Sequence, residues 1–173
     1  GSLAAFRIGF GALTAWMIYG FLRTEGDGPS GLSVLFTPPE TTWTFPYFGL
    51  SWVTPPAEPW TTVMFVVCFV SACLVSLGLL YRVASIALCL TYWHIVLMDA
   101  TLFGNHFPLV GVFAVLLVLI PAHRRYSLDR LLAAMFRARP GPTTVTFWNV
   151  LLVRVQTFLI YFYGGVSKLH EDW

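Results

Sequence analysis

The chain has 173 residues, of which 57% are hydrophobic, 17% aromatic and only 10% charged. A soluble domain carries charge on about a quarter of its residues, so this composition excludes an ordinary soluble protein. The formal net charge of +2 comes without a basic patch interleaved with aromatics, which argues against a nucleic-acid partner. We therefore expect an all-α integral membrane protein.

Five apolar runs alternate with polar segments along the chain, and about five transmembrane helices are expected. A helix needs about 20 apolar residues to cross a hydrocarbon core of about 30 Å. The first run is followed by no small-residue cleavage site, so we expect a retained span rather than a signal peptide. The fourth run is short for a full crossing. The expected spans are Leu3 to Leu22, Trp60 to Leu80, Val83 to Met98, Phe107 to Ile120 and Phe147 to Lys168.

The segment from Arg23 to Pro59 is rich in proline and aromatic residues. Prolines at this density forbid a continuous helix, while the aromatics argue against free disorder. We expect an ordered loop that lies as a cap on the outer membrane surface.

Charge predicts the topology. The loop from Pro121 to Phe147 holds half of the Lys and Arg residues, and around its middle an amphipathic piece, Ser127 to Phe136, has one apolar face. By the positive-inside rule this loop and the N-terminus are cytoplasmic. Counting spans then places Asn105, His106 and Lys168 together on the extracytoplasmic side.

The cysteines predict packing rather than chemistry. Cys68, Cys73 and Cys89 all lie inside apolar runs and form no C-x-x-C pair. Neither a thiol redox centre nor a metal site is expected from this pattern.

Lys168 is the only lysine, and it follows the pair Gly164-Gly165 at the end of the last apolar run. One interpretation is an anchor whose ammonium reaches the lipid headgroups. The other is a base, because burial can take the proton from a lysine but not from an arginine. Tyr161 and Arg154 share a helical face with this lysine.

Asp99, Asn105 and His106 cluster at the joint between the third and fourth runs. Ionisable groups near membrane depth tend to pair or to line a pocket, and a histidine can exchange a proton near neutral pH. The alternative is that Asp99 and Asn105 only cap helix ends. His94, inside the third span, is expected to make an interhelical hydrogen bond.

Several segments, taken in chain order, resemble a known family. They read SLAAFRIGFG, LLYRVASIALCLTYWHIVLMDATLFGNH, PAHRRYSLDRLL and YFYGGVSKLHEDW. They resemble the N-terminal membrane region of the vitamin K-dependent γ-glutamyl carboxylases and, equally, the bacterial HTTM (horizontally transferred transmembrane) proteins. The resemblance covers essentially the whole chain and implies a single transmembrane domain. Carboxylases continue beyond the lysine motif, so the chain is expected to be truncated at its C-terminus.

The resemblance implies a carbon–carbon lyase that uses reduced vitamin K, dioxygen and carbon dioxide, with no metal. Lys168 matches the base that deprotonates the hydroquinone, and His106 is the second expected catalytic residue. Asn105, Asp99 and Tyr161 are the expected quinol-binding residues. Oxidation of the quinol to its epoxide would drive removal of a γ-proton from a peptide glutamate, to which carbon dioxide adds. The implied partners are membrane lipid, a quinol and a glutamate-containing polypeptide.

Another class of function stays open. A non-catalytic HTTM membrane protein would assist peptide-toxin maturation or export, and arginine should then replace Lys168 without loss. A small-solute transporter is disfavoured, because the sequence has no inverted repeats or paired broken helices. Under the enzyme hypothesis, Arg7→Lys in the first span is expected to leave activity unchanged.

Overall fold

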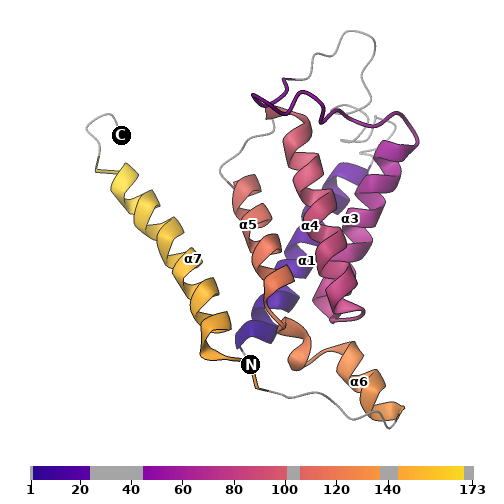
Figure 1. Ribbon diagram of the computed structural model, residues 1–173, viewed down its shortest axis with the longest axis vertical. Helices are drawn as coiled ribbons and strands as arrows, with labels where there is room; N and C mark the ends of the chain where they lie inside the picture. The colour runs from indigo at the N-terminus through magenta and orange to yellow at the C-terminus, as the bar shows by residue number, and fades with distance from the viewer. Residues whose placement is uncertain (1, 24–44, 101–105, 137–143, 170–173) are drawn as a thin grey trace.

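A computed structural model describes residues 2–23, 45–100, 106–136 and 144–169 (Figure 1). Throughout these ranges the regular secondary structure is helical, which confirms the all-α prediction. The elements are α1 (Ser2–Leu22), α3 (Trp60–Leu77), α4 (Tyr81–Met98), α5 (His106–Leu119), the 3-10 turn η2 (Ala122–Arg124), α6 (Leu128–Met135) and α7 (Phe147–Ser167).

Four of the described helices, α1, α3, α4 and α7, are long and apolar enough to cross a membrane. The fifth, α5, has 14 residues, and at 1.5 Å per residue it is about 21 Å long. It is therefore too short to cross a hydrocarbon core of about 30 Å by itself. The chain is an integral membrane protein whose described part has four helices long and apolar enough to span a membrane and one shorter apolar helix.

The bundle consists of α1, α3, α4 and α5, each packed against the next (Figure 1). The closest approach lies at Gly11 of α1, where a Cβ atom would stand 2.6 Å from the backbone nitrogen of Ser76 in α3. The Ser76 hydroxyl also donates a hydrogen bond to the carbonyl of Ile8 at 3.0 Å. Small residues let helix backbones meet closely in a bilayer, where apolar burial alone does not drive association.

The turn between α3 and α4 lies three residues earlier than the sequence predicts. Gly78 has φ +68°, and the N–H groups of Gly78 and Leu79 donate to the carbonyls of Val75 and Leu74. This Schellman motif ends α3 at a glycine, which adopts left-handed backbone without strain from a Cβ. Tyr81 and Arg82, which lie between the expected second and third spans, instead begin α4.

The last helix, α7, stands beside the bundle and contacts it mainly through α5 (Figure 1). Val150 and Val153, in its first half, pack against the hydrophobic core. None of its residues is buried. Toward the C-terminal end, Tyr161 and Tyr163 are 78% and 66% exposed. The described chain therefore leaves the second half of α7 open to lipid or to a partner.

The described end of the proline-rich segment, residues 45–59, lies against the end of α4. The N–H of Phe45 donates to the Asp99 carboxylate at 3.4 Å, and its carbonyl accepts from the N–H of Ala100 at 2.8 Å. Val53 is buried, whereas Phe48 and Trp52 are exposed. This part forms turns without a helix. The rest of the expected cap, residues 24–44, lies outside the described residues.

Candidate functional site

The predicted site residues come from the ends of three helices. Asp99 follows α4, His106 begins α5 and Lys168 follows α7. Because the helices alternate in direction, these three ends lie at the same end of the structure (Figure 1). We call it the site end. Asn105 lies outside the described residues.

Asp99 is 8% exposed and accepts the N–H of Phe45, so its carboxylate holds the loop against α4. Burial of the nearby Tyr47 hydroxyl raises the pKa of Tyr47 above its ordinary value, and the negative charge of Asp99 raises this pKa further. The buried Tyr47 hydroxyl has no hydrogen-bond partner among the described residues. The carboxylate of Asp99 therefore contacts the loop at the end of α4, and its expected role in binding a quinol stays a prediction.

His106 is exposed at the first position of α5, with its ring 4.6 Å from that of Phe107. The carbonyl of Phe107 accepts a hydrogen bond from the hydroxyl of the buried Tyr92 at 3.1 Å. This contact ties the start of α5 to α4 and presents the imidazole on a fixed backbone. His106 is thus accessible to a ligand.

Lys168 caps α7, and its backbone N–H donates to the carbonyl of Gly165 at 3.1 Å. The side chain is exposed in the structure. The sequence hypothesis of a base requires a desolvated ammonium. In the described chain α7 packs on the bundle through its first half, so the described residues do not bury the Lys168 side chain. A bound ligand or another polypeptide would have to cover it.

Aromatic rings line α7 just before the lysine. The rings of Phe158 and Phe162 stack at 5.6 Å, and Tyr163 meets Phe162 edge-on at 5.6 Å. Tyr161 lies two turns before Lys168 on the same helical face, as expected, and is largely exposed. Exposed aromatic faces of this kind can bind a flat ring.

His94 lies inside α4, and its buried Nε2 atom has no hydrogen-bond partner in the described part of the chain. The interhelical hydrogen bond expected of His94 stays a prediction. Its neighbour Trp93 makes such a contact, because its indole N–H donates to the carbonyl of Gly111 in α5 at 3.2 Å.

The opposite end of the bundle holds a buried polar network that sequence reasoning missed. Arg7 of α1 is completely buried, and its guanidinium donates to the carbonyls of Ala122 at 3.3 Å and Tyr126 at 2.6 Å. We call this the basic end, which carries η2, α6 and the turn between α3 and α4. An arginine at the seventh position of an apolar run was the available signal.

Asp129 of α6 fastens α6 to the rest of the basic end. Its two carboxylate oxygens accept the N–H groups of Leu80 and Tyr81 at 2.7 and 3.0 Å, and its own N–H donates to the carbonyl of Gly78. A helix start leaves such N–H groups unpaired and favours a negative charge. Asp129 therefore caps the start of α4, although it lies 48 positions after Tyr81 in the sequence.

His123 of η2 lies in the same network. Its ring centroid is 4.9 Å from that of Tyr81, and its carbonyl accepts the hydroxyl of Ser127 at 2.5 Å. Burial lowers the pKa of the imidazole below its ordinary value, and the charges of Arg82, Arg124 and Arg7 lower it further. Asp129 acts in the opposite direction. His123 is therefore held in its neutral form.

The described ranges contain no group of three His, Cys, Asp or Glu side chains placed to hold a metal ion. In these ranges Cys68, Cys73 and Cys89 are free thiols inside helices. The chemistry that the described residues offer is that of exposed acid–base groups and aromatic faces at the site end.

These features define an α-helical membrane protein with ionisable side chains at both ends of its helices, buried in a polar network at one end and exposed on helix ends at the other. A family model, the HTTM domain, matches residues 1–173, the whole chain. The chain therefore belongs to the HTTM family. No solved structure matches it significantly.

Proposed function

We propose that this chain forms part of a quinol-oxidising, carboxylase-like membrane enzyme in which Lys168 is the base. Two observations support the proposal: the chain belongs to the HTTM family, and the helix ends that carry Asp99 (α4), His106 (α5) and Lys168 (α7) lie at the same end of the structure. In this reading α7 supplies the lysine and α5 supplies a histidine that can polarise a quinol oxygen.

The overall reaction is balanced by its co-substrates. Reduced vitamin K and dioxygen yield the epoxide and water, while the glutamate γ-carbon loses a proton and gains carbon dioxide. The role of Lys168 is to accept the first proton, from a quinol hydroxyl. For this the ammonium must be desolvated, and a bound quinol ring against the exposed aromatics of α7 would exclude water from it.

A substrate dissolved in the bilayer could reach the exposed side of α7 directly. Tyr161 and Tyr163 are largely exposed on α7, and a lipid-soluble quinol can reach them laterally through the bilayer. Their rings offer faces for stacking, and their hydroxyls offer hydrogen bonds at the polar edge of the quinol. The extracytoplasmic location of Lys168 and His106 belongs to this proposal and follows from the positive-inside rule.

The test is quinol epoxidation by the purified chain in lipid nanodiscs, with reduced vitamin K, dioxygen and bicarbonate. We expect epoxide from the unaltered chain and at least a hundredfold less from Lys168→Arg, since arginine keeps the charge but does not release its proton. Arg23→Lys, an exposed exchange at the end of α1, is the matched control and should retain activity. Equal epoxide from both variants would contradict the role of Lys168.

A second candidate is a non-catalytic membrane partner in peptide-toxin maturation or export. It is favoured by the absence of buried residues along the described length of α7, which suits a helix that packs on another protein. In that case Lys168 anchors the helix end at the headgroups, and Lys168→Arg keeps full function in a toxin-export assay. The same variant therefore separates the two candidates.

A further inference from the structure

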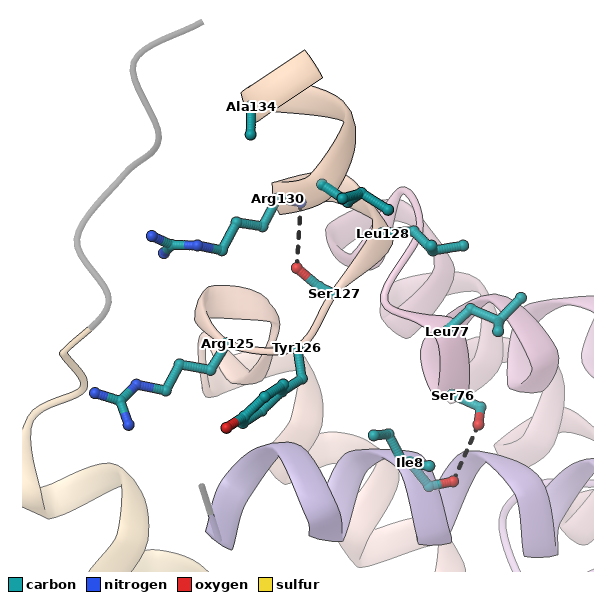
Figure 2. Close-up of a pocket in the computed structure, with 10 residues that line it drawn as sticks. Ile8, Ser76, Leu77, Arg125, Tyr126, Ser127, Leu128, Arg130 and Ala134 are labelled. Atoms are coloured by element: carbon teal, nitrogen blue, oxygen red, sulfur yellow. Dashed lines mark hydrogen bonds between the residues drawn. The ribbon is translucent and has the colours of Figure 1, made fainter. Parts of the chain in front are cut away.

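A groove of about 830 Å³ lies between α6 and the adjoining ends of α1 and α3 (Figure 2). Its lining is apolar along the helices and basic at its edge. The apolar residues are Ile8 of α1, Leu77 of α3 and Leu128, Leu131 and Ala134 of α6. This volume is within the range that binds small organic molecules.

The edge of the groove is positively charged. Arg125 and Arg130 both line it, and Figure 2 shows their guanidinium groups on the same side. Asp129, the one acidic residue between Pro121 and Phe147, is directed to the start of α4, where it accepts two N–H groups. No acidic side chain is among the described residues that line the groove. The edge therefore suits an anion.

The groove is also open to the hydrocarbon region. Ile8 and Leu77 are 43% and 52% exposed on helices long and apolar enough to span a membrane, so an acyl chain of the bilayer would have access to these side chains. Leu131 and Met135 leave the apolar face of α6 exposed, as in helices that lie in the membrane interface. The groove therefore continues from lipid-facing apolar surface to a basic edge at interface depth.

The exposed ring of Tyr126 also indicates that the basic edge of the groove lies at the depth of the membrane interface. Its φ of +50° is strained for a residue with a side chain, and the bond from Arg7 to its carbonyl holds it there. The result is a phenol ring that is 75% exposed beside Arg125 (Figure 2). Exposed tyrosines of membrane proteins concentrate at the headgroup level.

We propose that this groove binds one anionic phospholipid from the leaflet in which α6 lies. The phosphate lies between Arg125 and Arg130, whose planar guanidinium groups match phosphate oxygens. One acyl chain follows Ile8 and Leu77 along the bundle. Basic pockets between membrane helices bind anionic headgroups in this way. The inference is independent of the proposed quinol chemistry, because it concerns the opposite end of the molecule.

The test is lipid binding to the delipidated chain in detergent, measured by native mass spectrometry. Phosphatidylglycerol and phosphatidylcholine with identical acyl chains are titrated separately. We expect the first phosphatidylglycerol to bind about tenfold more tightly than phosphatidylcholine, since the phosphate of the zwitterionic lipid is offset by its own choline. Arg125→Gln should weaken the binding of phosphatidylglycerol about fivefold and leave the binding of phosphatidylcholine unchanged.

Control variants keep the result interpretable. Arg125 is exposed, so its replacement should leave the unfolding midpoint unchanged, whereas Arg130 also donates to the carbonyl of Arg124 at 3.1 Å. Arg23→Gln, at the other end of α1, removes one exposed arginine and should leave the lipid preference intact. Ala134→Trp fills the groove from an exposed position of α6 and should weaken both lipids.

Three results would overturn the proposal. One is equal affinity of the unaltered chain for both lipids. Another is an unchanged preference in Arg125→Gln. The third is displacement of phosphatidylglycerol by glycerol phosphate at matching concentration, which would show that the headgroup binds without help from the groove. Loss of the preference in Arg125→Gln with retention in Arg23→Gln supports the proposal.

Discussion

The two ends of this molecule differ in how far the charged groups described above are buried. At the basic end Arg7 is completely buried, and both carboxylate oxygens of Asp129 accept hydrogen bonds from N–H groups at the start of α4. At the site end Lys168 and His106 are exposed at helix ends. Among the described candidate residues at that end, Asp99 is the buried one, and its carboxylate contacts a loop.

The difference separates stability from ligand binding. A buried, hydrogen-bonded charge resists change, because removing one partner leaves the other unsatisfied. An exposed charge contributes little to stability and stays accessible to a ligand. We therefore expect substitutions of the buried, hydrogen-bonded groups at the basic end to destabilise the protein, and substitutions of the exposed Lys168 and His106 at the site end to affect only what the protein binds or does.

The largest expected effect is that of Arg7→Ala. It removes a large buried side chain and leaves the carbonyls of Ala122 and Tyr126 unpaired. We expect a loss of about 3–5 kcal/mol in the free energy of unfolding. Unfolding by SDS in mixed micelles measures it. A loss no greater than that of an exposed substitution such as Arg23→Ala would contradict the structural role of Arg7.

Gly78→Ala comes next. The glycine has φ +68°, and a Cβ atom would stand 2.6 Å from the guanidinium of Arg7 and 2.7 Å from Ser127. Left-handed backbone costs about 1–2 kcal/mol for a residue with a side chain, and the crowding adds to it, so we expect a loss of about 2–3 kcal/mol. Gly164→Ala is the control, because a Cβ atom there meets no neighbour within 4 Å. Equal losses of stability in Gly78→Ala and Gly164→Ala would contradict the requirement for glycine at position 78.

Asp129→Ala removes the cap of α4. The two N–H groups that it accepts would turn to water, and losing a helix cap costs about 0.5–2 kcal/mol. Asp129→Asn keeps one carbonyl oxygen and should lose less stability than Asp129→Ala. The comparison of both variants in the same SDS titration tests the cap, and an Asn variant as unstable as the Ala variant would argue against it.

A smaller effect is expected from pH. The pKa of His123 is lower in the folded protein than its ordinary value of 6.5, so the unfolded chain takes up a proton first as the pH falls. The stability that the neutral imidazole provides is complete above about pH 6.5 and is lost as the pH falls through the folded pKa. His123→Gln should flatten this dependence in unfolding measured from pH 7.5 to 5.5. A slope that survives the substitution would assign it to another group.

The smallest expected effect on stability is that of Lys168→Ala. The side chain is exposed at the end of a helix with no buried residue in its described length. We expect no measurable shift of the unfolding midpoint, in contrast to the large shift of Arg7→Ala. A destabilised Lys168→Ala would mean that the ends do not differ as described.

The spans could be predicted from the sequence because hydropathy over a window of about 20 residues sets them. The turn after α3 was placed three residues late, since the apolar run continues through Leu79 and Leu80 while the backbone bends at Gly78. A glycine inside an apolar run marks a helix end only when the hydrogen bonds around it are known.

The basic end could not be predicted, because its contacts join distant residues. Arg7 reaches Ala122 across 115 positions, and no local pattern pairs them. The location of Asp99, His106 and Lys168 at one end could be predicted, because it follows from counting helices. The exposure of Lys168 could not, since it depends on how α7 packs. The catalytic and quinol-binding roles remain predictions.

Because Lys168 is the only lysine and is exposed, the protein carries a built-in chemical label site. Within these 173 residues an amine-reactive reagent has one side-chain primary amine to modify. When this chain is purified and reconstituted in sealed vesicles, a reagent that cannot cross membranes will therefore report which face of the bilayer the end of α7 reaches. The same amine can hold a fluorophore or crosslinker at the site end without any engineered cysteine.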